Sequence, residues 1–467
     1  LIEWRDKMNK NIFREYDIRG IYQRDLNKDI VFSIGKYLAI ELKKRGGNSI
    51  AIGYDARVHS PNLFDYISNG ISSEGVKIYF MGMIPTPVAY FSLYHKFENM
   101  DNIDASIMIT GSHNPPQYNG FKITMLKEAF YGEDIKKIGK LVESRIYDFK
   151  EYTRDITNIN ALDEYINFLT NHFGNLKNFR YKVALDCGNG VAGLAITKVL
   201  ENLNIDFVGL YTSPDGTFPN HHPDPSIEEN LADLKKTMKE NSIKIGIAYD
   251  GDADRLALLS ENYSFKGDEL AILFAKKMLE SGLKPVIIGE VKCSKIMYDE
   301  INKIGKAIMY KTGHSNLKVK LKETNAHLAA EMSGHIFFND RYFGYDDALY
   351  SSLRALELFL DSSIRDVESA IKNLPQMYST PEEKIESSEE EKFKIIENLA
   401  TKLSNPPSDF PKILDIITID GLRVVFENGW GLIRASNTTP ILVTRFEATT
   451  KELAIFYKQK MLDLLRD

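Results

Sequence analysis

The segment Thr110–Lys122 (TGSHNPPQYNGFK) combines side chains that could carry chemistry with residues that stiffen a loop. Ser112 stands between a glycine and His113, two prolines follow, and a lysine ends the segment. Prolines fix φ and glycines permit positive φ, so we expect a stiff loop that holds one hydroxyl in place. A neighbouring histidine and an ammonium group within reach indicate a nucleophile or a carrier of a transferred group. An ordinary proline-rich surface loop is the alternative.

Three aspartates at alternate positions, Asp250, Asp252 and Asp254, lie between two apolar runs in IKIGIAYDGDADRLALLS. Carboxylates this close repel one another unless a cation lies among them, and hard oxygen ligands favour Mg²⁺ or Ca²⁺. Arg255 occupies the sixth position, where a calcium-binding EF-hand loop needs glycine, and the flanks have strand patterns. The sequence therefore predicts a Mg²⁺ site for phosphoryl chemistry, with a solvated acidic turn as the alternative.

Two further groups of polar residues suit a phosphorylated sugar. Glu331, Ser333 and His335 alternate in AEMSGH, and on an extended segment they would project to one face, where they could bind sugar hydroxyls. A half-buried strand is the alternative. The loop Arg434–Pro440 (RASNTTP), with Arg445 beyond it, offers a guanidinium, hydroxyls and backbone N–H groups to a phosphate dianion. Here an ordinary polar turn is equally compatible with the sequence.

Gly188, Gly190 and Gly193 have the spacing of a dinucleotide-binding fingerprint, between a strand and a helix pattern. The acidic residue expected at the end of the next strand is missing, so we expect a tight strand-to-helix turn. A dinucleotide-dependent oxidoreductase is the less favoured alternative. His221 and His222 form a loop pair with no evident metal partner.

The elements that must position these residues repeat along the chain. Apolar runs at residues 48–57, 180–193 and 284–294 each precede an amphipathic stretch and a second apolar run. Such alternation predicts parallel sheets covered by helices on both faces, and its spacing predicts three similar mixed α/β domains.

The C-terminal part has a different pattern. A helix with a capping box at Ser388 and Glu391 precedes three strand-like segments and a terminal helix, which predicts a smaller α+β domain. We expect the charged run Glu389–Lys392 to be a solvated first helical turn.

Composition excludes several classes of protein. The 467 residues are 43% hydrophobic and 27% charged with a net charge of −6, as in ordinary multidomain globular proteins. Dense clusters of lysine and arginine are missing, which argues against nucleic-acid binding. The two cysteines, Cys187 and Cys293, fit a reducing compartment. No apolar run suits a membrane helix or a secretory signal, so we expect a cytoplasmic protein without a membrane partner.

Seven motifs in order resemble the α-D-phosphohexomutase superfamily, most closely its bifunctional phosphomannomutase/phosphoglucomutase branch. The resemblance covers nearly the whole chain, with Ala330 replacing the family's glycine before the sugar-binding glutamate. The motifs are FREYDIRG, TGSHNPPQYNGFK, FPNHHPDP, DGDADR, KTGHS, AEMSGH, and RASNTTP with RFEA after it.

This resemblance implies three similar α/β domains with largely parallel sheets and a smaller α+β domain around a central active-site cleft. The boundaries expected are 1–157 with the phosphoserine loop, 158–260 with the metal loop, 261–373 with the sugar loop and 374–467 with the phosphate loop.

The resemblance also implies site residues. Ser112 would carry the phosphoryl group and, with Asp250, Asp252 and Asp254, bind one Mg²⁺. The other catalytic residues would be Arg19, His113, Lys122 and His335, with Lys122 or His335 accepting a proton. Residues that contact the substrate would be Tyr16, Lys292, His314, Glu331, Ser333, Arg434, Ser436, Asn437 and Thr438.

The implied reaction moves phosphate between O1 and O6 of mannose or glucose through a hexose 1,6-bisphosphate, which is both intermediate and activator. Small hexose phosphates would be the partners of a monomer or weak homo-oligomer. A phosphoglucosamine or N-acetylglucosamine phosphate mutase and a silent sugar-phosphate binder are the alternatives.

Overall fold

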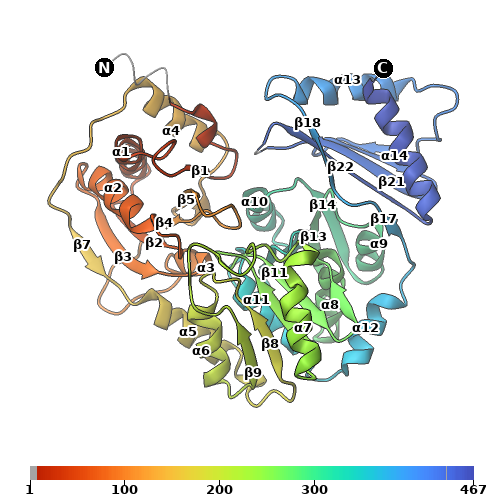
Figure 1. The fold of residues 1–467 in the computed structure, drawn as a ribbon, viewed down its shortest axis with the longest axis horizontal. Helices are drawn as coiled ribbons and strands as arrows, with labels where there is room; N and C mark the ends of the chain where they lie inside the picture. Colours follow the sequence, from red (N-terminus) through yellow and green to blue (C-terminus); the bar gives the residue numbers. More distant parts are fainter. Residues whose placement is uncertain (1–7, 438, 467) are drawn as a thin grey trace. The chain divides into compact units, whose positions relative to one another are not determined.

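The computed structural model describes residues 8–437 and 439–466, which divide into two compact units. Unit 1 comprises the residues up to Gly267 together with Ser333–Ile364, and unit 2 comprises Asp268–Met332 together with the residues from Arg365 onward. Figure 1 traces the helices and strands of both units in sequence colours. The expected boundaries of four domains stay a prediction, because the division seen here is into two units.

The first sheet of unit 1 is mixed. Its strands β2, β3, β4 and β7 are parallel, whereas β1 and β5 run antiparallel to their neighbours. In spatial order the strands are β1 (Ile18–Ile21), β5 (Tyr118–Met125), β4 (Ala105–Ile109), β2 (Ser49–Tyr54), β3 (Lys77–Met83) and β7 (Ile156–Asn158), with β6 (Glu128–Ala129) beside β5. The helices are η2 (Lys10–Ile12), α1 (Lys28–Lys44), α2 (Ser60–Ser72), α3 (Thr86–Phe91) and α4 (Glu133–Ser144).

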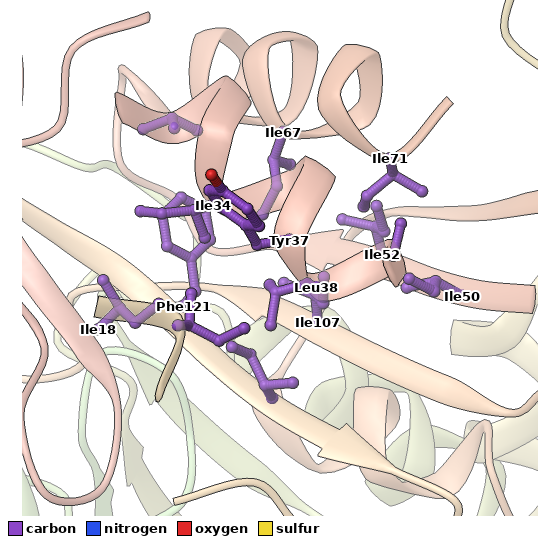
Figure 2. Close-up of a cluster of buried hydrophobic side chains, with 14 of the residues drawn as sticks. Ile18, Ile34, Tyr37, Leu38, Ile50, Ile52, Ile67, Ile71, Ile107 and Phe121 are labelled. Atoms are coloured by element: carbon purple, nitrogen blue, oxygen red, sulfur yellow. The ribbon is translucent and has the colours of Figure 1, made fainter. Parts of the chain in front are cut away.

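Helices α1 and α2 bury apolar side chains against this sheet. Ile34 and Leu38 of α1 are four residues apart, as are Ile67 and Ile71 of α2, so each pair lies on one face of its helix. Figure 2 shows these side chains directed toward those of the strands, among them Ile52. This core fixes the strands whose ends carry the chemically active loops.

The second sheet of unit 1 combines a parallel trio with two antiparallel strands. Its spatial order is β12 (Tyr263–Phe265), β11 (Leu256–Ser260), β10 (Ile245–Tyr249), β8 (Val183–Asp186) and β9 (Phe207–Leu210). The remaining elements of the unit are α5 (Ala161–His172), η3 (Gly174–Leu176), α6 (Gly193–Asn202), η4 (Glu228–Leu231), α7 (Ala232–Glu240), β16 (Ile336–Phe338) and α11 (Ala348–Glu357).

The glycine-rich motif after β8 is the tight strand-to-helix turn that the sequence predicts. A Cβ on Gly190 would lie 2.6 Å from the carbonyl oxygen of Gly251, and one on Gly193 would lie 2.0 Å from that of Thr212. Close backbone approach therefore accounts for these glycines, and the turn packs directly against the loop of the three aspartates.

Unit 2 contains the third α/β arrangement. Strands β14 (Lys306–Tyr310), β13 (Val286–Glu290) and β15 (Leu328–Ala330) are parallel, with β13 in the middle. The helices are α8 (Gly267–Glu280), α9 (Lys295–Ile304), α10 (His314–Thr324) and α12 (Ile364–Lys372). The first residue of α8 and the first residue of α12 are each the last residue of a segment of unit 1.

The C-terminal part of unit 2 is α+β, as predicted. Its antiparallel strands are, in spatial order, β17 (Tyr378–Ser379), β22 (Ile441–Ala448), β21 (Gly429–Ala435), β20 (Leu422–Phe426) and β19 (Asp415–Ile417), with β18 (Glu383–Glu386) beside β22. Helices α13 (Lys392–Ser404) and α14 (Lys451–Arg466) contribute to its apolar core. Among the described residues, no helix is both long enough and apolar enough to cross a membrane.

The prediction that Glu389–Lys392 forms a solvated turn is wrong for its last residue. Lys392 is buried, and its Nζ donates to the carbonyl oxygens of Ser436 (2.7 Å) and Thr439 (3.2 Å). The capping prediction holds in part, because the Ser388 hydroxyl accepts the Glu391 N–H while the side chain of Glu391 caps nothing. A lysine read from sequence as solvated thus supports the loop Arg434–Pro440.

The histidine pair of FPNHHPDP has a structural role. His221 Nε2 lies 3.0 Å from Asp186 Oδ2, and this hydrogen bond raises the pKa of His221 above its usual value. A histidine with a raised folded-state pKa stabilises the fold fully below the unfolded-state pKa, and this stabilisation is lost as the pH rises through the folded-state pKa.

We therefore expect His221→Gln to destabilise the protein by roughly 1 kcal/mol at pH 6 and by less at pH 8. Thermal unfolding of both proteins across this range measures the difference in free energy. A difference that grows with pH would contradict the assignment.

Candidate active site

The loop after β4 presents Ser112 as a buried hydroxyl. Ser112 has a positive φ of 50°, and its N–H donates to Thr110 Oγ1 at 2.7 Å. Its Oγ donates to Asp250 Oδ2 at 3.0 Å and lies 3.0 Å from His113 Nδ1. The structure thus joins the two segments that sequence analysis selects first, although they are far apart in the chain.

The three aspartates lie in the loop between β10 and β11, and all are fully buried. Carboxylate oxygens from Asp250, Asp252 and Asp254 lie within 4.8 Å of one another. Burial, and then the charges of the two other aspartates, raise the pKa of Asp250 well above its usual range. Ionising the cluster is therefore costly without a compensating cation.

Lys122 supplies one positive charge to this cluster. Its Nζ donates to Asp252 Oδ2 at 2.6 Å and to Asp254 Oδ2 at 2.5 Å. Although burial opposes both changes, this pairing raises the pKa of Lys122 and lowers that of Asp252. Thr86 also donates its hydroxyl to Asp252 Oδ2, at 2.6 Å.

The cluster fits a divalent cation. The Oδ1 atoms of Asp252 and Asp254 are buried, and neither accepts a hydrogen bond from any residue that the structure describes. Three carboxylates, two of them with such an oxygen, form the hard donor set that Mg²⁺ and Ca²⁺ prefer. These residues, with the Ser112 oxygen beside them, could hold a metal ion.

Cationic and imidazole groups surround the hydroxyl. Arg19 Nη1 donates to the Gly111 carbonyl at 3.1 Å, and its Nη2 pairs with Asp17. Burial, with Arg255 and Arg19 nearby, lowers the pKa of His113 well below its usual value. This histidine is therefore neutral at pH 7.

Sequence reasoning missed two residues that contact His335. Arg255 Nε donates to His335 Nε2 at 3.1 Å, and Asp346 Oδ2 lies 3.2 Å from His335 Nδ1. Arg255 directly follows the last aspartate, a position that could have drawn attention to it. Asp346 lies in a tyrosine-rich loop that offers no such signal.

The expectation that Glu331, Ser333 and His335 project to one face of an extended segment is wrong. The residues between β15 and β16 form a turn, in which Gly334 has a φ of +92°. Glu331 lies in unit 2, whereas Ser333 and His335 lie in unit 1.

In unit 2, several predicted substrate residues share neighbours. The Arg434 guanidinium pairs with Asp420, whose Oδ2 also accepts the Thr312 N–H at 3.0 Å. The adjacent Gly313 N–H, which precedes His314, donates to Glu331 Oε1 at 2.6 Å.

Lys292 belongs to the same neighbourhood. Its Nζ lies 3.1 Å from Glu382 Oε2. Burial opposes the change, but the carboxylates of Glu290, Glu382 and Glu331 raise the pKa of Lys292. It therefore stays protonated and can attract an anion.

The remaining predicted residues are placed as follows. Tyr16 is half-buried just before β1 in unit 1, and Ser436 and Asn437 follow β21 in unit 2. Ser436 Oγ lies 2.9 Å from Thr439 Oγ1. Thr438 lies outside the described residues.

A buried serine against a carboxylate cluster, on mixed α/β sheets, is an arrangement suited to metal-assisted group transfer. Comparison with known families specifies it further. Models of the phosphoglucomutase/phosphomannomutase family match four stretches: alpha/beta/alpha domain I at residues 10–147, domain II at 163–264, domain III at 266–378 and the C-terminal domain at 384–464. The chain belongs to the phosphoglucomutase/phosphomannomutase family.

The names of individual relatives agree with this family. The chain is 40% identical to a phosphoglucomutase of Neisseria meningitidis, over 95% of this chain and 94% of that one. It is 39% identical to a phosphomannomutase/phosphoglucomutase of Pseudomonas aeruginosa, over 95% and 92%. A crystal structure of a phosphoglucomutase/phosphomannomutase family protein from Burkholderia thailandensis matches 98% of both chains, with a TM-score of 0.88 and 36% identity.

The contacts of the buried Lys392 lead to a prediction about the loop Arg434–Pro440. Lys392→Met removes the ammonium group that holds the carbonyls of Ser436 and Thr439, so the loop loses its shape. If this loop binds the substrate phosphate, we expect the KM for a hexose phosphate to rise about tenfold, with a smaller change in kcat. Steady-state kinetics with the exposed neighbour Lys394→Met as a control would test this, and equal KM values in both variants would refute it.

Proposed function

We propose that this chain moves a phosphoryl group between O1 and O6 of a hexose phosphate, with mannose and glucose as its sugars. Family membership over nearly the whole chain supports this proposal. The observation that carries it is the hydrogen bond from the Ser112 hydroxyl to Asp250, inside a buried cluster of carboxylates. A transferable phosphoryl group on Ser112 would be highly charged, and only a site that can hold a cation suits it.

In the proposed cycle, Ser112 begins as phosphoserine. A free sugar hydroxyl forms a bond to phosphorus while the bond between phosphorus and Ser112 Oγ breaks. Of the two proton acceptors expected from sequence, Lys122 is held protonated by Asp252 and Asp254, so the hydroxyl loses its proton to His335. The serine oxygen regains a proton as it leaves phosphorus. The product of this half-reaction is a hexose 1,6-bisphosphate.

The second half-reaction reverses the first at the other end of the sugar. The bisphosphate turns end for end and returns its other phosphoryl group to Ser112. Any bisphosphate that escapes leaves a dephosphorylated serine, so added bisphosphate acts as an activator. One Mg²⁺ per chain, held by Asp250, Asp252 and Asp254, would stabilise negative charge on the transferring group.

A cationic arginine and a neutral histidine complete the proposed phosphoryl site. Arg19 contacts the serine loop through Gly111 and Asn114, and His113 lies against the serine oxygen. A guanidinium here would stabilise the transferring group, since charge-assisted hydrogen bonds to phosphoryl oxygens are strong.

We further propose that the residues implied by the family resemblance contact the bound sugar phosphate. The basic side chains of Lys292 and Arg434 pair with Glu382 and Asp420, and a substrate phosphate could compete for them. The proposed substrate residues are Tyr16, Lys292, His314, Glu331, Ser333, Arg434, Ser436, Asn437 and Thr438.

We propose that the enzyme is cytoplasmic and acts as a monomer or weak homo-oligomer. Small hexose phosphates are the only partners that we propose for it. Two buried, free cysteines and a net charge of −6 are compatible with a reducing compartment and with no nucleic-acid partner. Assays with mannose 1-phosphate, glucose 1-phosphate and N-acetylglucosamine 1-phosphate, each with Mg²⁺ and a trace of the matching bisphosphate, distinguish the proposed sugars from the alternative.

The central test is the loss of the nucleophile. We expect Ser112→Ala to lower kcat by at least about 10³-fold, because alanine has no hydroxyl to carry the phosphoryl group. Intact-mass analysis should find one phosphoryl group on the wild-type protein and none on the variant. Ser144→Ala, an exposed serine of unit 1, is the control. Full turnover by Ser112→Ala would exclude the phosphoserine mechanism.

A further inference from the structure

We infer that Arg57 is a positioning residue that fixes the conformation of the nucleophile loop and thereby sets the rate of phosphoryl transfer at Ser112. This inference rests on the proposed function of Ser112 as phosphoryl carrier. Arg57 lies in the sequence GYDAR, at the polar end of the apolar run 48–57. Its side chain is fully buried.

Topology brings Arg57 to the serine loop. Strands β2 and β4 are adjacent and parallel, so the segments that follow them emerge at the same edge of the sheet. Asp55 and Arg57 follow β2, and the loop containing Ser112 follows β4. The guanidinium lies so close to this loop that a Cβ on Gly111 would be 2.4 Å from Arg57 Cζ.

The guanidinium uses every one of its N–H groups within the fold. Nη2 donates to the carbonyls of Ser112 (2.8 Å) and Asn114 (2.6 Å), and Nη1 to those of Pro115 (2.6 Å) and Tyr118 (2.9 Å). Nε donates to Asp55 Oδ2 at 3.2 Å. An arginine has five N–H donors, so none is left for substrate, and Arg57 acts through the loop.

Asp55 and Arg57 together form a clamp on the serine loop. Its Oδ2 accepts the Thr110 hydroxyl at 2.7 Å and the Gly111 N–H at 3.2 Å. Thr110 in turn accepts the N–H of Ser112. The Asp55–Arg57 pair therefore binds donors just before the serine and carbonyls from the serine onward.

Such a clamp has a physical purpose at Ser112. The positive φ of 50° is a sparsely populated conformation for a residue with a side chain, and surrounding contacts must maintain it. It directs Oγ to Asp250, and a displacement of about 1 Å can lower a transfer rate roughly 10²-fold. Lysine cannot replace Arg57, because one ammonium group has three donors and no planar fork.

The experiment compares Arg57→Lys with the wild-type protein under saturating Mg²⁺ and bisphosphate. We expect kcat to fall roughly 10²-fold and the KM for the hexose phosphate to change by less than about threefold, since substrate contacts remain. The rate of Ser112 phosphorylation by hexose 1,6-bisphosphate, followed by rapid-quench mass spectrometry, should fall by the same factor as kcat. Unchanged kcat and phosphorylation rate would overturn the inference.

Arg354→Lys is the matched control, because Arg354 is also a buried, ion-paired arginine of unit 1. If both variants lose stability and activity equally, Arg57 has only a general structural role and the inference is wrong. In Arg57→Ala, added guanidinium should restore part of kcat, whereas it should restore none in Ser112→Ala.

A second variant covers the case in which Arg57→Lys does not fold. Asp55→Asn keeps the shape of the side chain but loses the charge that pairs with Arg57, and it should lower the phosphorylation rate with little change in KM. An unchanged rate in this variant would contradict the clamp. Wild-type protein with no phosphoryl group on Ser112 and no mutase turnover would instead refute the proposed function. This outcome differs from the results that would refute the role of Arg57 alone.

Discussion

The main physical constraint on the site is the electrostatic cost of placing three buried carboxylates beside one hydroxyl. Asp250, Asp252 and Asp254 bring their oxygens within 4.8 Å of one another, where ionisation is expensive without positive charge. Lys122 offsets part of this cost, and Oδ1 oxygens of two aspartates remain available to a cation. A phosphoryl group on Ser112 adds further negative charge, so binding of a cation and phosphorylation of the serine should favour each other.

The fold meets this requirement by placing two loops at the ends of buried strands. The serine loop follows β4 and the aspartate loop follows β10, both strands having apolar, covered faces. Around these loops lies a second set of residues that contact backbone and not substrate. Arg57 and Asp55 hold the serine loop, and the glycine-rich turn after β8 packs against the aspartate loop. The positions of the reacting side chains are therefore fixed by residues that take no part in the reaction.

Sequence reasoning predicted the features that depend on local pattern and motif order. The alternation of strands and helices predicted mixed α/β sheets with an α+β C-terminal part, and Ser112 and the aspartates were predicted to act together. It could not predict Arg57, Thr86 or Lys392 as parts of these sites, because each acts on a segment distant in sequence. It was wrong to place Glu331, Ser333 and His335 on one face of an extended segment, because the segment is a turn in which Gly334 has a positive φ.

Anomalous diffraction from crystals grown with Mn²⁺ tests the central claim most directly, since Mn²⁺ accepts the oxygen ligands that Mg²⁺ uses. The account predicts one strong peak within bonding distance of Asp250, Asp252 and Asp254, with an oxygen of Ser112 or its phosphoryl group as a further ligand. A cation bound elsewhere in the chain, with the three aspartates uncoordinated and Ser112 directed away from them, would contradict it.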